Sequence, residues 1–392
     1  MLKKTIATAV VLAVISSTTS LAATELPAPI KGQMMIPVIV NGLKVLFPDT
    51  EPFIDDNGRT MVPVRFVSEK LGGEVKWDAA SKVVTITYKS KVITMPLNSN
   101  EVSIDGAPIT LDTSAVLTEG RTMVPLRFVS EAMEATVVWD EPAHAVQVND
   151  AAFTAKAEAG EVKLDPWGRQ LATNSDPAIA KDWKTLTDLP DMAYETIVET
   201  VGLADRNNKK YFDVNRNNIF TSRESLDRWS NMIRQYYVTV LNVDYRTINE
   251  KTFHDAITPL ILDINYSDNL VYYVNLAIID YVKFVKNNHI ITRGYADPEP
   301  YLTRQENSLP IIRTHFKFEI IQSDDRTQSI LDSYHVSDKS DKIEFKRNTW
   351  YTGYSDVKLI TTAGNYQEEH MFINVNLENM FLTDQYKYEV LK

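Results

Sequence analysis

The sequence predicts an α+β protein built of two parts, and three observations support this prediction. First, residues 58–69 return as residues 120–131 with eleven of twelve positions identical at an offset of 62, so the first part contains a duplicated unit. Second, 17 of the 18 tyrosines lie beyond residue 190, which marks a change of composition. Third, the second part shows helical periodicity first and alternating strands afterwards, the order typical of helices packed on an antiparallel sheet.

The first 22 residues are predicted to be a secretory signal peptide. Lys3 and Lys4 form a positive start, residues 6–15 are apolar, and Ser20-Leu21-Ala22 fits a cleavage site between small residues. The apolar run is shorter than the about 20 residues that a membrane-spanning helix needs. We therefore expect a secreted, cell-surface or cell-wall protein that begins at Ala23 and has no membrane span after cleavage.

Composition excludes several classes of function. The chain has no cysteine, which excludes disulfides, thiolate nucleophiles and cysteine metal sites. Its formal charge is −11, and removal of the two signal lysines makes the mature chain more negative still. Such a charge argues against nucleic-acid partners, because phosphate backbones are bound by basic surfaces. The composition leaves the oligomeric state open.

Each copy of the repeat, within residues 36–150, is predicted to begin with a hairpin. Asn41-Gly42 ends a short alternating strand in the first copy, and Asp105-Gly106 does so in the second. Both dipeptides favour tight two-residue turns, because their residues tolerate positive φ. A second strand and a loop then lead to the conserved-looking motif shared by the two copies.

The shared motif is predicted to contain a helix at residues 64–71, followed by strands at 74–77 and 83–88. The helix has four apolar positions: Val64, Phe66, Val67 and Leu71. Gly72-Gly73 ends it, since glycine accepts the left-handed conformation. The second copy has Glu134-Ala135 there, so a different exit is expected. Each unit is therefore β-β-α-β-β, and the two units can share one sheet or one core.

The motif Gly-Arg-Thr-Met-Val-Pro-Val-Arg-Phe-Val-Ser-Glu, with Trp77-Asp78 after it and its echo at Trp139-Asp140, resembles the copper amine oxidase N-terminal domain family. The resemblance covers about residues 36–149. It implies a stalk domain, an antiparallel sheet packed on a helix, in a secreted or envelope protein of a Gram-positive bacterium. It implies a spacer or interaction role, without copper and without catalysis.

The chain is not expected to be an amine oxidase. Its second part is much shorter than the catalytic domain of such an enzyme. Asn265-Tyr266-Ser267 and Asn365-Tyr366-Gln367 do not fit the Asn-Tyr-Asp/Glu motif from which the quinone cofactor forms. Copper would need a His-x-His pair, and the six histidines are all isolated: His144, His254, His289, His315, His335 and His370.

The motif contributes four arginines: Arg59, Arg65, Arg121 and Arg127. The favoured interpretation is structural, with each arginine pairing with a helix glutamate or capping a carbonyl inside its own unit. The alternative is that they bind an anionic polymer such as teichoic acid.

Residues 151–190 are predicted to be a linker, which begins with a linker or short connecting helix at 151–160, and residues 191–392 to be the α+β C-terminal domain. Helices are expected at residues 192–203, 222–241, 250–262 and 269–286. Strands are expected at 311–321, 342–351, 356–361 and 369–377. This order is similar to cone-shaped folds of the nuclear-transport-factor type, an analogy of fold that transfers no function.

One segment before the second helix has the spacing of a calcium loop. Six positions match the ligands of an EF-hand: Asp213, Asn215, Asn217, Ile219, Thr221 and Glu224. Asn218 replaces the usual glycine, and asparagine is the next residue best suited to a left-handed conformation. With two ionised ligands, a dissociation constant of about 10⁻⁴ to 10⁻³ M is expected. The competing interpretation is a capping box formed by Thr221 and Glu224.

No catalytic motif is present: the chain lacks Gly-x-Ser-x-Gly, His-Glu-x-x-His and a phosphate loop. Carboxylates from Asp244-Tyr-Arg246 and Asp297-Pro-Glu299 are the candidates for a glycosidase pair, since such pairs form only in the fold. The run 348–354, with Trp350, Tyr351 and Tyr354, is the candidate for an exposed aromatic surface that stacks on glycans.

The sequence as a whole predicts a secreted, non-catalytic envelope protein. Its stalk domain would present a C-terminal binding domain, stabilised by calcium if the loop is a true site, to a cell-wall glycan or an envelope protein. Two alternatives stay open: a carbohydrate-active enzyme with an accessory stalk, and a structural component of an envelope or spore layer.

Overall fold

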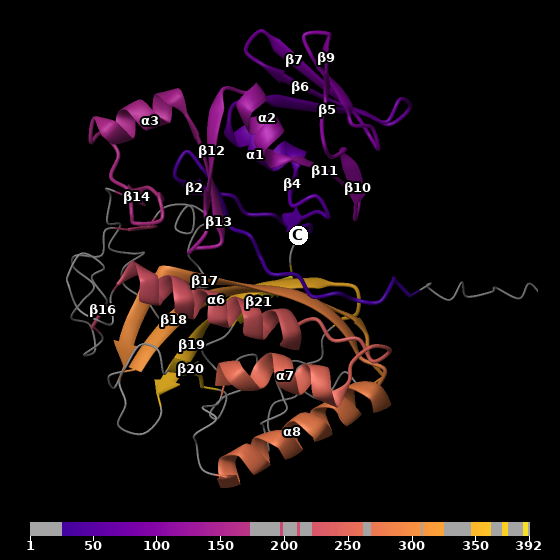
Figure 1. Ribbon diagram of the computed structural model, residues 1–392, viewed down its shortest axis with the longest axis vertical. Helices are drawn as coiled ribbons and strands as arrows, with labels where there is room; N and C mark the ends of the chain where they lie inside the picture. Colours follow the sequence, from indigo (N-terminus) through magenta and orange to yellow (C-terminus); the bar gives the residue numbers. More distant parts are fainter. Residues whose placement is uncertain are drawn as a thin grey trace, which may run out of the picture.

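The computed structural model describes residues 26–172, 197–198, 210–211, 222–261, 268–306, 309–324, 346–361, 371–374 and 387–390. Figure 1 shows a β-rich N-terminal part stacked on one face of a long, bent sheet, with three helices on its other face. The predicted α+β fold, with a β-rich first part and a helices-then-sheet second part, is confirmed. Among the described helices, none is long and apolar enough to cross a membrane.

The N-terminal part consists of short strands, two helices of seven residues and a connecting helix. Its elements are β1 (Val38–Val40), β2 (Leu43–Lys44), β3 (Phe53–Ile54), β4 (Thr60–Pro63), α1 (Val64–Lys70), β5 (Glu74–Asp78), β6 (Val83–Tyr88), β7 (Lys91–Pro96), β8 (Glu101–Ile104), β9 (Ala107–Thr110), β10 (Val116–Thr118), β11 (Arg121–Pro125), α2 (Leu126–Ala132), β12 (Ala135–Asp140), β13 (Ala145–Asp150) and α3 (Ala151–Glu158).

The two copies of the repeat are related by a local two-fold axis. Strands β4 and β11 pair antiparallel, with Val62 opposite Val124, its equivalent 62 residues later. The final hairpin of the second copy joins the first hairpin of the first copy in the sheet β12-β13-β1-β2. The final hairpin of the first copy and the first hairpin of the second copy share the sheet β5-β6-β7-β8-β9, in which the additional strand β7 lies between the two hairpins. The copies therefore close one shared hydrophobic core, built around residues such as Val67 and Val129.

The two helices leave through the same backbone conformation, which corrects the expectation of a different exit in the second copy. Gly72 has φ +85° after α1, and Glu134 has φ +65° after α2. The Glu134 carboxylate accepts from Lys89 at 2.6 Å and lies 2.9 Å from the Lys91 ammonium. These contacts lower the pKa of Glu134 to about 2, the Lys89 hydrogen bond having the largest effect. Ion pairs thus accompany a conformation that glycine adopts without strain.

The predicted short helix after the repeat is present as α3. Asp150 caps it, because its carboxylate accepts the Phe153 N–H at 2.7 Å. Beyond α3 the chain reaches β14 (Leu171–Ala172), which pairs in parallel with β15 (Ile197–Val198). These last two residues lie inside the predicted helix 192–203, so they form a strand and not a helical turn; the rest of that helix lies outside the described residues.

The C-terminal part contains three of the four predicted helices, each within two residues of its expected ends. The helices are α6 (Arg223–Val240), α7 (Glu250–Ile261) and α8 (Asp268–Asn287). The strands are β16 (Lys210–Tyr211), β17 (Ile291–Glu306), β18 (Leu309–Gln322), β19 (Trp350–Thr361), β20 (Met371–Ile373) and β21 (Lys387–Val390). They form one antiparallel sheet of order β16-β17-β18-β19-β20, with β21 paired to β19.

Strand β17 is the longest strand of the described chain, and the sequence pattern does not predict it. Its Asp-Pro-Glu-Pro segment resembles a turn, because proline removes a ladder donor. The structure accommodates this segment at a register shift between Pro298 and Thr303. Strand β19 also differs from expectation, since it runs without a break from residue 350 through 361. Only the last two residues of the predicted strand 342–351 belong to it: residues 346–349 precede it, and residues 342–345 lie outside the described residues.

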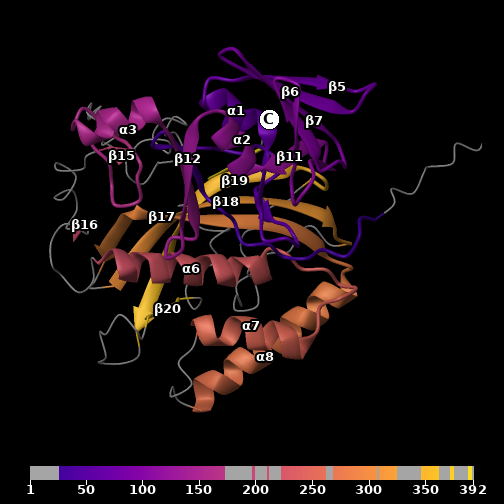
Figure 2. The ribbon, with the colours of Figure 1, turned by 45° about the horizontal axis from the view of Figure 1, so that its top comes forward.

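The long sheet has one apolar face and one charged face, and both are buried. In β18, Phe316, Phe318 and Ile320 point toward the helices and belong to the core that also contains Trp229 of α6. The alternate residues point the other way, toward the N-terminal part: the Lys317 ammonium donates to the Phe47 carbonyl at 2.9 Å. Figure 2 shows the sheet enclosed between helix α6 and the N-terminal part. The N-terminal part therefore covers the charged face of the sheet.

Candidate functional site

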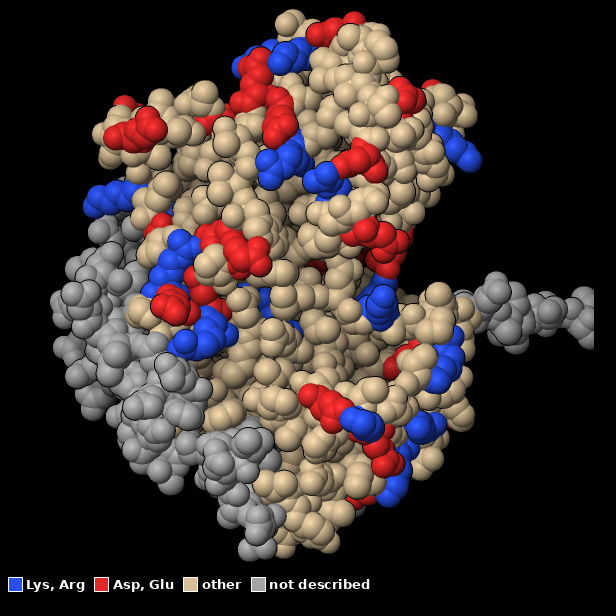
Figure 3. All heavy atoms as spheres, viewed as in Figure 1, with Lys and Arg blue, Asp and Glu red and all other residues tan. Residues whose placement is uncertain are grey.

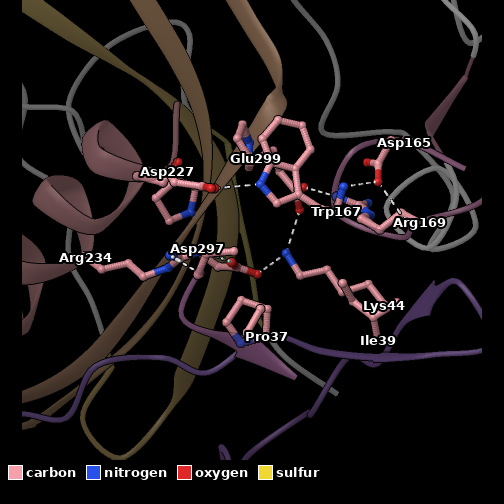
Figure 4. Close-up of a pocket in the computed structure, with 15 residues that line it drawn as sticks. Pro37, Ile39, Lys44, Asp165, Trp167, Arg169, Asp227, Arg234, Asp297 and Glu299 are labelled. Carbon is pink, nitrogen blue, oxygen red and sulfur yellow. Dashed lines mark hydrogen bonds and ion pairs between the residues drawn. The ribbon is translucent and has the colours of Figure 1, made fainter. Parts of the chain in front are cut away.

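The junction between the two parts contains a buried ionic cluster centred on Asp297 and Glu299. Both carboxylates come from β17, two residues apart, so they share the sheet face that meets the N-terminal part. Lys44 of β2 reaches between them, forming an ion pair with Asp297 and donating to Glu299 at 2.8 Å. Arg169 forms an ion pair with the other oxygen of Glu299 (Figure 4). All four side chains are almost fully buried, at 6% exposure or less.

The cations near each carboxylate determine whether it is ionised in this cluster. Burial alone raises the pKa of Glu299, but Arg169 and Lys44 more than offset that effect and lower it to about 2. Asp165 shows the opposite balance: burial raises its pKa to about 6, although Arg169 and backbone hydrogen bonds act to lower it. Glu299 therefore stays ionised at neutral pH, while Asp165 titrates close to it.

Two further contacts join the cluster to helix α6. Arg234 donates to the Ala143 carbonyl at 3.1 Å, and its guanidinium lies 3.8 Å from Asp297. The Trp167 indole donates to Asp227 at 2.6 Å. Trp167 and Arg169 belong to a turn that Asp165 closes by accepting their backbone N–H groups at 2.9 and 2.8 Å. This turn lies in the predicted linker, yet its side chains are buried between the two parts (Figure 4).

The cluster lines a partly open cavity of about 30 Å³. That space admits one or two water molecules and excludes a sugar ring. The structure thus brings the candidate carboxylates Asp297 and Glu299 together, but with a lysine between them and no room for substrate. The third candidate, Asp244, instead accepts from Arg246 at 2.8 Å and from the Ile30 backbone N–H at 3.0 Å. It fastens the first described residues to the C-terminal part.

The described rings of the aromatic run 348–354, Trp350 and Tyr351, do not form the expected exposed strip; the side chain of Tyr354 lies outside the described residues. Trp350 stacks on Tyr295 with ring centroids 6.1 Å apart, beneath the N-terminal part, and the Lys317 ammonium lies 5.2 Å from its ring. Tyr351 points to the opposite face of β19 and stacks on Phe318 inside the core. Strand alternation sends neighbouring aromatic residues to opposite faces.

The motif arginines follow the structural interpretation only in part. Within their own units, Arg65 and Arg127 lie 3.8 and 3.7 Å from glutamates one helical turn away. Arg59 and Arg121 instead reach across the two-fold axis. Arg59 donates to Asp112 of the second copy at 2.8 Å, and Arg121 donates to Asp49 of the first at 2.7 Å. The exchange follows from the two-fold axis, which places each copy's loop against the other copy's motif.

A larger, open groove runs along the junction beside the ionic cluster. We call it the junction groove; its volume is about 1290 Å³. The β12–β13 hairpin forms one wall and helices α6 and α7 form the other. Figure 3 shows acidic and basic side chains interspersed over this face of the molecule, without a large patch of one sign. The residues that line the groove include Val138, Trp139, Asp140, Gln147, Arg223, Glu224, Asn231, Met232, Gln235 and Phe372.

The proposed calcium ligands are described only at Glu224. This residue lies exposed in the first turn of α6 and lines the junction groove. Asp213, Asn215, Asn217, Ile219 and Thr221 lie outside the described residues. Ser222 is the N-cap, accepting the Ser225 N–H at 3.2 Å, so the capping box predicted from Thr221 is wrong. Among the described residues, no group of three or more His, Asp or Glu side chains is placed to hold a metal ion.

Comparison with known proteins identifies only the repeat. No curated protein and no solved structure matches the chain, so the analogy with nuclear-transport-factor cones stays a prediction. No family model matches the C-terminal part. Residues 39–148 match the model of the copper amine oxidase N-terminal domain, in agreement with the two-fold unit described above. The chain therefore carries a copper amine oxidase N-terminal domain at residues 39–148, joined to an α+β part without a matched family.

Proposed function

We propose that this protein is a secreted, non-catalytic component of a bacterial envelope that binds cell-wall glycan in the junction groove. The observation that supports this most is the groove itself, because both parts of the chain line it. Binding sites occur preferentially where two domains meet. Its volume exceeds the about 300–1,000 Å³ typical of small-molecule sites, which favours an extended ligand.

The lining of the junction groove suits a sugar polymer. Gln147 and Gln235 offer amide groups that can donate to and accept from sugar hydroxyls, whereas the Asn231 amide already donates to the Pro142 carbonyl and accepts from Arg234. Trp139 and Phe372 offer aromatic surface, on which the apolar face of a sugar ring can pack. Charges of both signs also line the groove, so a largely neutral polymer with many hydroxyls fits better than a strongly charged one.

The ionic cluster supports a structural role for the N-terminal part within the site. Removing one partner of a buried ion pair is strongly destabilising, so Lys44, Arg169 and their carboxylates hold the two parts in one relative position. A fixed position is what a groove built from two parts requires. In this proposal the stalk forms one wall of the binding site and does more than act as a spacer.

The carbohydrate-active enzyme is the second candidate, and the proximity of Asp297 and Glu299 is the observation that favours it. It would require the N-terminal part to withdraw Lys44 and expose the pair. Release of reducing sugar from cell walls by the mature protein would support the enzyme over the binding protein.

The binding proposal is tested by co-sedimentation of the mature chain with purified Gram-positive sacculi. Val138 of β12 is 52% exposed in the groove wall, so the larger side chain of Val138→Trp should obstruct this wall and reduce the bound fraction at least tenfold. Val92→Trp is the matched control, because Val92 is a 41% exposed strand valine of the same part and does not line the groove. Equal sedimentation of both variants and the wild type, or no sedimentation at all, would contradict the proposal.

A further inference from the structure

A second pocket lies inside the N-terminal part, next to the junction groove. We call it the motif pocket; its volume is about 290 Å³. Arg59, Thr60, Arg127, Val137, Trp139 and Val146 are among its lining residues. Of the described residues that line it, only Arg59 and Arg127 are ionisable, and both are cationic. Each arginine pairs with an exposed carboxylate that does not line the pocket, Arg59 with Asp112 and Arg127 with Glu131.

The two-fold axis explains why two arginines meet in this pocket. Arg59 is the second residue of the motif in the first copy, and Arg127 is the eighth residue of the motif in the second copy. Pairing of β4 with β11 places the start of each motif beside the helix of the other copy. A single copy could therefore not place these two arginines in the lining of one pocket.

The present partners of both arginines lie in water and can be exchanged. The Arg59 and Asp112 side chains are 49% and 56% exposed, and those of Arg127 and Glu131 are 60% and 56% exposed. Exposed ion pairs contribute little to stability, because water screens them and holding two long side chains costs entropy. An incoming oxyanion can therefore replace a carboxylate at small cost. A guanidinium presents paired N–H groups that match carboxylate and phosphate oxygens.

Trp139 connects the motif pocket with the junction groove, since it lines both. A glycan that packs on this ring would bring its substituents to the edge of the motif pocket. We propose that the motif pocket binds an anionic substituent, carboxylate or phosphate, of the glycan that occupies the junction groove. This inference rests on the proposed function and adds the chemical class of the ligand.

The acidic net charge does not prevent such binding. At physiological ionic strength the Debye length is about 8 Å, so distant carboxylates are largely screened. The nearby carboxylates, Asp112 and Glu131, pair with the two arginines and must turn away when the anion binds. Because only two cations contact the anion, binding should weaken modestly with added salt.

Soluble probes test the inference without cell walls. Glucuronate, glucose 1-phosphate and neutral glucose are titrated into the mature protein, and the Trp139 indole signal is followed by NMR after assignment with Trp139→Phe. At least one anionic probe should bind ten times more tightly than glucose. Arg59→Ala with Arg127→Ala should remove that preference. The matching double lysine variant, which keeps the charge but loses the fork, should retain part of it.

The control is Lys251→Ala, which removes a cation from another exposed pair one helical turn apart, on α7. It should bind like the wild type. Equal binding of anionic and neutral sugars, or full retention of the preference in the double alanine variant, would overturn the inference. The relative affinity of glucuronate and glucose 1-phosphate distinguishes carboxylate from phosphate as the natural group.

Sedimentation with sacculi separates this inference from the proposed function. Binding lost in Val138→Trp but unchanged in the double alanine variant, with sacculi that retain their phosphodiester polymers, would leave the groove proposal standing and contradict the anion pocket. Binding weakened by the alanine pair only while those polymers are present would support both and assign the anion to phosphate.

Discussion

His315 illustrates the cost of burying a charged sheet face. Its Nε2 atom lies 2.7 Å from the Thr352 hydroxyl. Burial is the main cause that lowers the pKa of His315 to about 3, and the Lys44 and Lys317 ammonium groups add to it, while Glu299 opposes it. The histidine is therefore neutral in the folded protein at pH 7. In the unfolded chain it takes up a proton near its ordinary pKa of 6.5.

Acid should therefore destabilise the protein through this residue. Between pH 6.5 and 3 the unfolded chain binds one more proton than the folded one, so the free energy of unfolding falls by up to about 1.4 kcal/mol per pH unit. His315→Gln removes the titration and should flatten the slope between pH 7 and 5. Urea unfolding at several pH values measures it, with His254→Gln on α7 as the control expected to follow the wild type. An unchanged slope in His315→Gln would contradict the assignment.

Two carboxylates of the ionic cluster also affect how stability depends on pH, one in a lower pH range and the other with the opposite sign. The lowered pKa of Glu299 contributes stability above pH 4.5 that is lost as pH falls toward about 2, below the window of the measurement. The raised pKa of Asp165 has the opposite sign, since protonation below about pH 6 favours the folded state. The histidine variant isolates one contribution because neither carboxylate is changed.

Among the elements, those with a strong local pattern were predictable and those that depend on distant neighbours were not. The hydrophobic periodicity of α6 gave its extent, since Leu226, Trp229 and Ile233 are all buried. Strand β17 has no such pattern: its charged residues suggest a solvent-exposed face, and its prolines suggest a turn. The N-terminal part buries that face, and the local sequence pattern of β17 contains no sign of this contact with a distant part of the chain.

The entry to α6 carries the calcium proposal. We propose that the loop before Ser222 binds Ca²⁺ and that Glu224, exposed in the first helical turn, contributes its carboxylate. Millimolar Ca²⁺ should raise the melting temperature of the mature chain relative to chelator, and Asp213→Ala with Glu224→Ala should abolish the rise. Glu250→Ala, which removes the acidic residue in the first turn of α7, is the matched control. No calcium-dependent rise in the wild type would refute the site.

For the whole molecule, the duplicated motif predicted the first part and its shared core, but not the junction. Lys44 and Glu299 lie 255 residues apart, so neither local spacing nor composition could place them together. The available signal in the sequence was Trp167, close to Arg169 in the predicted linker, because tryptophan is highly buried on average and is unusual in a flexible connection. Both side chains are buried in the structure. The candidate groove exists only because these contacts join the two parts.

The two parts of the chain are expected to form one body whose junction builds the binding groove, and calorimetry of the mature chain tests this. We expect one cooperative transition. Glu299→Gln leaves Lys44 and Arg169 facing a neutral amide, so it should lower that single melting temperature by several degrees, in line with about 3–5 kcal/mol for a broken buried ion pair. Asp112→Asn, in an exposed pair, should leave it nearly in place. Two separate transitions in the wild type, neither of them moved by Glu299→Gln, would contradict the account.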